Sequence, residues 1–303
     1  MTDIIRVKGL SKYFGNFHAV NNLNLTVKQG EIYGFLGANG SGKTTTMKML
    51  SGLLTPTSGH GECLGFDLLN AQTSIQKMVG YMPQHFGYYT TLSVRENLAF
   101  IAGLHGLNIK QSVDASLDRF DLTSRQHQLT GTLSGGWKQR LSLAASIMHQ
   151  PKLLLLDEPT AGVDPDSRRY FWDTIAELAS SGMTVLVSTH YMDEAERCTY
   201  LGFMHQGKLV KHGMANHLVQ QAPLKAYYVH GAHLMALGCS IEQQFPDVIM
   251  IRFGRHLHII MNKCIDEKPM IQSISQQYHG TYFTSTELSI EHLFIYLIRR
   301  GQM

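Results

Sequence analysis

The sequence predicts an α/β core with a helical insertion, followed by a small α+β module. Three observations support this fold class. A strand-like segment at residues 31–36 leads into a glycine-rich loop and then into a helix. Continuous apolar runs at residues 153–156 and 184–188 are typical of parallel strands that are buried on both faces. After about residue 220 the pattern changes to strand–helix–strand–strand–helix–strand.

The elements of the core follow from apolar spacing and turn residues. Residues 4–7 and 23–27 alternate in the manner of strands, with a turn near Gly15 and Asn16. Residues 45–50 begin a helix, which ends in a turn at residues 55–59. The further elements expected in chain order are a strand end at 79–83, largely helical chain over 84–150, a strand at 153–156, a crossover helix at 167–180 and a strand at 184–188. We therefore expect one core domain over residues 1–220, with a helical subdomain over residues 84–150.

Residues 221–303 are expected to form a separate accessory module. Strands are expected at 226–229, 248–253, 257–261 and 281–283, and helices at 234–245, 270–277 and 290–300. The two middle strands should pair as a hairpin across Gly254 and Arg255. This element order suggests a ferredoxin-like topology. His256 and His258 share one strand face, and we expect them to be solvated or hydrogen-bonded rather than to bind a metal.

The loop at residues 37–44 carries the strongest functional signal. It fits the pattern Gly-x-x-x-x-Gly-Lys-Ser/Thr and lies between a strand and a helix. The backbone amides at such a helix start point at one anion-sized spot, so the loop is expected to bind a nucleoside triphosphate. The residues expected to hold the nucleotide are Gly37, Ala38, Asn39, Gly40, Ser41, Gly42, Lys43, Thr44 and Thr45.

Two adjacent carboxylates, Asp157 and Glu158, end the apolar run at residues 153–156. We expect Asp157 to hold Mg²⁺, directly or through water, opposite the hydroxyl of Thr44. Glu158 is expected to orient and deprotonate the water that attacks the γ-phosphate. The alternative, a strand end with solvated acids followed by a turn, is disfavoured because the pair occurs together with the phosphate-binding loop.

Residues 133–140 read Leu-Ser-Gly-Gly-Trp-Lys-Gln-Arg and indicate a second anion-binding helix start. Ser134, Gly135 and Gly136 open this helix, and two positions without side chains leave backbone amides exposed to an anion. The residues expected on its buried face are Trp137, Leu141, Ala144 and Met148. Because the loop at residues 37–44 already surrounds one set of phosphates, this helix start is expected to serve a different nucleotide.

In the content and order of its motifs, the chain resembles the ATPase subunits of ABC transporters over about residues 3–215. Residues 133–140 look like the signature sequence of that family. The resemblance implies that ATP and Mg²⁺ bind and that ATP is hydrolysed. Four more roles are implied: Tyr13 stacks on adenine, Gln84 touches magnesium and water, Asp164 is the acid of a loop that crosses a dimer interface, and His190 holds the γ-phosphate.

Two positions leave a choice open. The usual fifth signature residue in the family is glutamine, whereas this chain has Trp137. The anion contact of Ser134, Gly135 and Gly136 is still expected, while the tightness of the dimer seam beside Trp137 stays open. Tyr13 is followed by Phe14, so either ring is a candidate for the base, with Tyr13 favoured.

The resemblance also implies partners. In this family two cassettes face each other head to tail, and the signature of one covers the ATP of the other. One cassette is present here, so a homodimer or a sister ATPase subunit is implied. Residues 40–47 and 188–196 look most like exporter subunits of the multidrug and antibiotic-resistance type. Such subunits act with a separate membrane-spanning permease, which implies a cytoplasmic protein on the cytoplasmic face of the cell membrane.

Composition narrows the alternatives. The net charge is +3 and the basic residues are spread along the chain, so no nucleic-acid partner is expected. The four cysteines never form a Cys-x-x-Cys pair, which disfavours zinc and disulfides. No apolar run approaches the roughly 20 residues that cross a bilayer, and no secretory signal is seen, so we expect a soluble chain.

Two other functions were considered. A non-transport ABC ATPase acting in DNA repair or on ribosomes is disfavoured, because the chain has neither coiled-coil heptads nor a second phosphate-binding loop. A small-molecule kinase is disfavoured because it would explain neither residues 133–140 nor His190.

Overall fold

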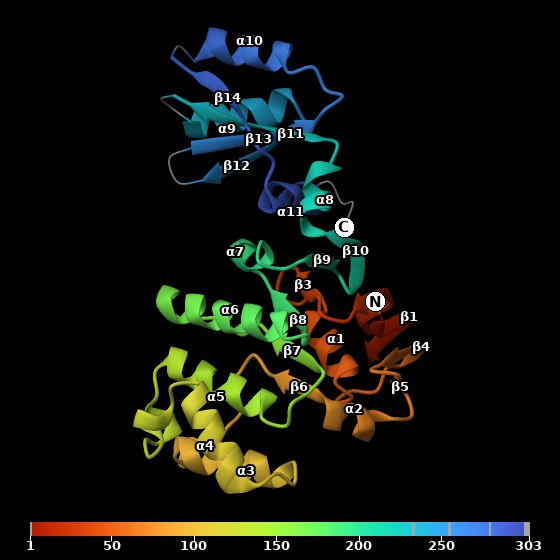
Figure 1. Cartoon of the computed structure of the whole chain (residues 1–303). Helices are drawn as coiled ribbons and strands as arrows, with labels where there is room; N and C mark the ends of the chain where they lie inside the picture. The colour runs from red at the N-terminus through yellow and green to blue at the C-terminus, as the bar shows by residue number, and fades with distance from the viewer. Residues whose placement is uncertain (1, 232–233, 254–255, 279, 300–303) are drawn as a thin grey trace. The chain divides into compact units, whose positions relative to one another are not determined.

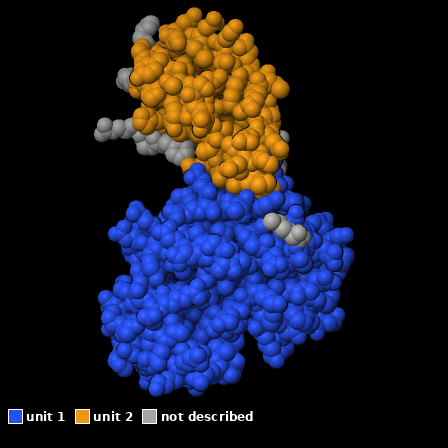
Figure 2. Space-filling model, in the orientation of Figure 1, with its two compact units in different colours: residues 1–212 blue, residues 213–303 orange. Residues whose placement is uncertain are grey.

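The computed structural model describes residues 2–231, 234–253, 256–278 and 280–299. The chain forms two compact units, residues 1–212 and residues 213–303 (Figure 2). The compact units therefore divide at 212/213. The boundary at 220/221 expected from the sequence remains a prediction about where the cassette ends.

The first unit contains two sheets (Figure 1). The four-stranded sheet is antiparallel and has the order β2-β1-β4-β5. Its strands are β1 (Asp3–Phe14), β2 (Phe17–Lys28), β4 (Ser58–Cys63) and β5 (Phe66–Asp67). The six-stranded sheet has the order β10-β9-β3-β8-β7-β6. Its strands are β3 (Ile32–Leu36), β6 (Val79–Met82), β7 (Leu153–Asp157), β8 (Thr184–Thr189), β9 (Tyr200–His205) and β10 (Lys208–Met214).

The central strands of the six-stranded sheet position the functional loops. Every residue of β3, β7 and β8 is buried, as the unbroken apolar runs predict. β3 pairs with β8, and β8 with β7, all in parallel. Their carboxyl ends therefore lie at the same edge, where Leu36 is opposite Thr189 and Asp157 is opposite Ser188.

The helices of the first unit cover this sheet and form the expected helical part. They are α1 (Lys43–Leu50), α2 (Gln72–Met78), α3 (Val94–Leu104), α4 (Ile109–Arg119), α5 (Gly135–Ile147), α6 (Pro165–Ser180) and α7 (Met192–Ala195), with 3₁₀ turns at Thr123–Arg125 and Thr130–Thr132. α3, α4 and α5 lie side by side as one group (Figure 1). Ser93 and Glu96 form a capping box that starts α3, and Asp164 caps α6 by accepting from the backbone N–H of Ser167. The prediction of a helical insertion is thus confirmed.

The second unit confirms the predicted strand–helix–strand–strand–helix–strand order. Its elements are α8 (Ala215–Gln220), β11 (Leu224–His230), α9 (Leu234–Gln244), β12 (Ile249–Phe253), β13 (His256–Asn262), α10 (Lys268–Gln277), β14 (Tyr282–Thr286) and α11 (Ile290–Arg299). The antiparallel sheet has the order β12-β13-β11-β14, which is the ferredoxin-like arrangement. The expected turn at Gly254 and Arg255, and Arg300 of the last helix, lie outside the described residues. His258 is hydrogen-bonded, with its Nδ1 2.7 Å from Nε2 of His292 on α11.

Some expectations were incomplete or wrong. Residues 58–59 start β4 rather than ending a turn, and β9, β10, α2 and α8 were not expected. On α5, Leu141 and Ala144 are buried as expected, whereas Trp137 and Met148 are only half-buried. In the described part of the chain, no helix combines the length and the apolar character needed to cross a bilayer.

Candidate functional site

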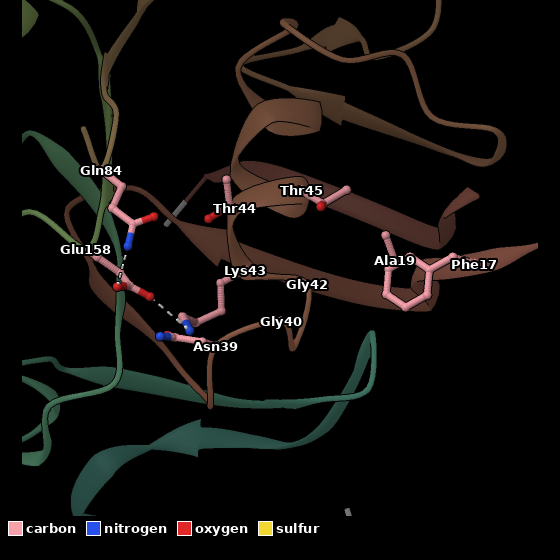
Figure 3. Close-up of a pocket in the computed structure, with 10 residues that line it drawn as sticks. All are labelled: Phe17, Ala19, Asn39, Gly40, Gly42, Lys43, Thr44, Thr45, Gln84 and Glu158. Carbon is pink, nitrogen blue, oxygen red and sulfur yellow. Dashed lines mark hydrogen bonds and ion pairs between the residues drawn. The ribbon is translucent and has the colours of Figure 1, made fainter. Parts of the chain in front are cut away.

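A cavity of about 320 Å³ lies at the start of α1 and beside the ends of the central strands. Figure 3 shows the side chains around it. The residues that line the cavity are Phe17, Ala19, Asn39, Gly40, Gly42, Lys43, Thr44, Thr45, Gln84 and Glu158. Six of the nine loop residues expected to hold a nucleotide therefore surround one space.

The glycines of the loop are required by its backbone. Gly40 and Gly42 have φ angles of 79° and 103°, in the region that favours glycine. A Cβ atom on Gly42 would lie 2.5 Å from the carbonyl oxygen of Ala19, and one on Gly37 would lie 2.4 Å from that of Met204. Glycine therefore lets the chain pass close to its neighbours at both positions, so that the loop can curve around the start of α1, where backbone amides suit a phosphate group.

Lys43 is buried beneath this loop, with 3% of its surface exposed. Its ammonium group donates to the carbonyl oxygens of Gly37 at 2.8 Å and Ala38 at 3.1 Å. It also lies 3.2 Å from Oε1 of Glu158 (Figure 3). The loop thus holds one fixed positive charge next to its amides, which is the chemistry that binds a polyphosphate.

Glu158 follows β7 in an unusual backbone conformation, with φ at 46°. A non-glycine residue in this region costs about 1–3 kcal/mol, which the surroundings must offset. The backbone N–H of Glu158 donates to two oxygens of Ser188, the side-chain Oγ at 3.0 Å and the backbone carbonyl oxygen at 3.1 Å. The turn directs the carboxylate of Glu158 toward three side chains. One is Lys43, described above. The other two contact Oε2, which accepts from Nε2 of Gln84 at 2.9 Å and lies 3.3 Å from Nδ1 of His190.

Asp157 has the properties of a ligand for a hard cation. Its Oδ1 accepts from the hydroxyls of Thr44 at 3.1 Å and Ser188 at 2.6 Å. Its Oδ2 is buried and has no hydrogen-bond partner among the residues that the structure describes. Carboxylate and hydroxyl oxygens are ligands that suit Mg²⁺, so these residues fit the metal expected from the sequence.

The second anion-binding motif does not belong to this cavity. Ser134, Gly135 and Gly136 start α5, and none of them lines the cavity. A Cβ atom on Gly136 would lie 2.1 Å from Oγ of Ser167, so glycine lets the start of α5 approach the start of α6. Asp164 lies at the same contact, where its Oδ1 accepts from the backbone N–H of Ser167 at 2.9 Å.

Two side chains of α5 connect this motif to its surroundings. The ring of Trp137 lies between the guanidinium groups of Arg125, 4.4 Å from the ring centroid, and Arg140, at 4.6 Å. Gln139 donates from Nε2 to the carbonyl oxygen of Pro159, directly after Glu158. The helix that carries the second motif is thus in contact with the segment that carries the carboxylates.

At one end of the cavity lies an aromatic ring other than the one expected from the sequence. Phe17 lines the cavity and is 63% exposed, whereas Tyr13 is absent from the lining. The ring of Tyr13 lies 4.3 Å from that of His18, its partner across β1 and β2. Phe14 pairs with Phe17. Phe17 is not among the residues expected from the sequence, although its place just after the Gly15–Asn16 turn, opposite Phe14, was a usable signal. The expectation that Tyr13 stacks on the base stays a prediction.

The structure therefore divides the expected residues into two groups. Around the cavity it brings together the loop at residues 37–45, Gln84, Asp157, Glu158 and His190. Away from the cavity it brings together residues 134–136 and Asp164.

Comparisons with known proteins agree with this geometry. The ABC transporter family model matches residues 20–161. The chain is 45% identical over 222 residues to "Probable multidrug ABC transporter ATP-binding protein YbhF" of Escherichia coli K12. That alignment covers 72% of this chain and 38% of the relative, so the chain spans well under half of that relative's length. It is 40% identical to the bacitracin transport ATP-binding protein BcrA of Bacillus licheniformis, with 72% of each chain covered.

Among solved structures, an ATP-binding subunit of an ABC transporter is similar with a TM-score of 0.65 and 27% identity. The match covers 72% of this chain and 92% of that one. The fold is that of an ABC ATPase cassette, joined to a ferredoxin-like module. The chain belongs to the ATP-binding proteins of the ABC transporter family.

Proposed function

We propose that the chain binds ATP with Mg²⁺ and hydrolyses it to drive an exporter through a separate membrane-spanning permease. One observation supports this proposal above the others: Lys43, Gln84 and His190 surround the carboxylate of Glu158 at the phosphate-binding loop. This arrangement provides a charge for the phosphates and a base for a water molecule at the same place.

Each side chain has a distinct task in the proposed reaction. Lys43 and the amides of the loop bind the phosphates, and Glu158 accepts a proton from the attacking water. Gln84 and His190 orient Glu158, and His190 also contacts the γ-phosphate. Thr44, Asp157 and Gln84 would hold Mg²⁺, which supplies charge neutralisation on the phosphate oxygens when bound. Phe17 extends the cavity with an aromatic face that is suited to a base.

A second copy of the cassette is part of this proposal. The amides of residues 134–136 suit an anion but lie apart from the cavity of their own chain. A homodimer or a sister subunit, arranged head to tail, would place them over the nucleotide of the partner. The names of two relatives, a probable multidrug ABC transporter ATP-binding protein and a bacitracin transport ATP-binding protein, support a role in transport. A position at the cytoplasmic face of the membrane is part of the same proposal.

Replacing Glu158 with Gln tests the reaction and the dimer together. The substitution keeps the shape of the side chain but removes the base, so ATP hydrolysis should fall by about 10²- to 10⁴-fold. ATP should still bind, and the trapped dimer should appear in size-exclusion chromatography with ATP. The double variant with Lys43→Ala should elute as a monomer. A monomer of the single variant at saturating ATP would contradict the proposed dimer.

Replacing Lys43 with Ala tests the loop alone. Loss of a buried, charge-assisted contact to the phosphates should weaken ATP binding by about 10- to 100-fold in calorimetry. Lys48→Ala is the matched control, because Lys48 is an exposed lysine of the same helix. Equal affinity of the two variants would rule out the assigned role of Lys43.

A further inference from the structure

Glu194 is a buried carboxylate outside the cavity. It lies on α7, shortly after His190, and only 1% of its surface is exposed. It does not line the cavity.

Glu194 contacts the two segments that carry Glu158 and His190. One oxygen, Oε1, accepts from the hydroxyl of Thr160, which follows Glu158 and Pro159 in the chain. The other, Oε2, accepts from the hydroxyl of Thr189 at 2.6 Å, and Thr189 directly precedes His190. Both threonines are buried, with 0% and 1% of their surfaces exposed. One carboxylate therefore joins the ends of the neighbouring strands β7 and β8.

Thr189 extends this connection to the phosphate-binding loop. Its hydroxyl accepts from the backbone N–H of Tyr191 at 3.0 Å, which shapes the turn around His190. Its carbonyl oxygen accepts from the backbone N–H of Gly37 at 3.3 Å. The hydroxyl that Glu194 holds therefore shapes the turn at His190, whereas the bond to Gly37 joins backbone to backbone and does not involve that hydroxyl.

Stability alone does not account for a carboxylate at this position. Burial raises the pKa of Glu194, since a charge is removed from water. The nearest cation, Nε of Arg168, is 3.9 Å from Oε1, and another nitrogen of Arg168 pairs with Asp193 at 3.3 Å. A buried acid with so distant a counter-ion is seldom more stabilising than an apolar side chain of the same size. What it provides is two acceptors in fixed positions.

We propose that Glu194 is a positioning residue for ATP hydrolysis: by accepting from Thr160 and Thr189, it fixes the segments that present Glu158 and His190 to each other. This role rests on the ATPase function proposed above. It concerns the rate of the chemical step and not the binding of nucleotide, because the phosphate contacts of Lys43 and the loop do not involve Glu194.

The test replaces Glu194 with Gln in the full chain. Glutamine has nearly the same shape, but its amide nitrogen donates and cannot accept, so one threonine hydroxyl can no longer donate to this side chain and has to reorient. We expect kcat to fall by about 10- to 100-fold because the reacting groups are misplaced. ADP affinity in calorimetry should stay within about twofold, because Lys43 and its contacts to the loop do not involve Glu194. Glu196→Gln is the matched control, since Glu196 is an exposed glutamate next to the same helix, and it should retain wild-type kcat.

The outcomes separate the two proposals. Wild-type kcat in the Glu194→Gln variant, with active wild-type and Glu196→Gln proteins, would overturn the positioning role and leave the ATPase function standing. A parallel loss of ADP affinity would also overturn it, because it would indicate a general structural defect. No hydrolysis by the wild-type chain would overturn the ATPase function first.

A second pair of variants covers the case in which Glu194→Gln fails to fold. Thr160→Val removes the hydroxyl at constant size, whereas Thr160→Ser keeps it. We expect kcat to fall in Thr160→Val and to be restored in Thr160→Ser, with equal ADP affinity. Equal kcat values in the two variants would overturn the proposal.

Discussion

At the scale of single residues, the site depends on how Glu158 is held. Its left-handed backbone would normally favour glycine, yet two bonds from its N–H to Ser188 stabilise the turn. The carboxylate then faces Lys43, Gln84 and His190 rather than solvent. Strain at this position is thus compensated by a side chain, Ser188, that also binds Asp157.

Phe17 provides a residue-scale prediction. Its ring lines the cavity, while the ring of Tyr13 lies against His18. Replacing Phe17 with Ala should weaken ATP binding by about 1–2 kcal/mol, the usual contribution of a ring stacked on a base. The binding of inorganic tripolyphosphate, which has no base, should not change. Both affinities can be measured by calorimetry.

Tyr13→Ala is the comparison for this experiment. If it weakens ATP binding more than Phe17→Ala does, the sequence-based choice of Tyr13 is correct and the assignment of Phe17 is wrong.

At the scale of elements, two stacked histidines make α5 sensitive to acid. His149, just after α5, lies on His105, just after α3, with ring centroids 4.0 Å apart. Burial, together with the charge of His105, lowers the pKa of His149 to about 4. The unfolded chain, with a histidine pKa of about 6.5, binds a proton first as the pH falls. The contribution of His149 to the stability of the fold is therefore fully present above about pH 6.5 and is lost as the pH falls toward 4.

The prediction concerns the slope of stability with pH. Between pH 7 and pH 5, the free energy of unfolding should fall by about 1–2 kcal/mol more in the wild type than in His149→Gln, allowing for partial exposure of the ring. Urea titrations at both pH values measure the difference. His60→Gln, which replaces an exposed histidine of β4, should leave the slope unchanged. Equal slopes for wild type and His149→Gln would contradict the prediction.

Which elements could be predicted depends on where their stability originates. β3, β7 and β8 were predicted because each contains a run of apolar residues in its own sequence. β4 was missed because its sequence, Ser-Gly-His-Gly-Glu-Cys, has no such pattern, and its strand conformation comes from pairing with β1. There a Cβ atom on Gly61 would lie 2.7 Å from the carbonyl oxygen of Arg6, so the glycine that weakens the local signal permits the pairing.

The site was predictable to a similar extent. The loop and the acid pair are contiguous in sequence, so their chemistry can be read from it. Ser188 and Glu194 make their contacts with segments distant in the chain, and nothing in their immediate neighbours indicates those contacts.

At the scale of the whole molecule, each unit has its own apolar core. The first is centred on residues such as Phe35, Met47 and Leu155, and the second on residues such as Val229 and Ile259. We expect two unfolding transitions in calorimetry, of which ATP raises only that of the first unit. Ile259→Ala should lower the free energy of unfolding of the second unit by about 2–5 kcal/mol, and with it the temperature of the other transition.

Leu155→Ala is the matching change in the first core and should lower the transition that ATP raises. A single transition that both substitutions lower equally would show that the two units unfold together.

Gln139 has a consequence for communication between subunits. It reaches from the middle of α5 to the carbonyl beside Glu158, while the first turn of α5 presents Ser134 outward. A second copy that displaces that turn would shift the carbonyl group of Pro159, and with it Glu158, through the side-chain amide of Gln139. In the head-to-tail dimer proposed above, α5 would therefore link the binding of the second copy to the position of Glu158.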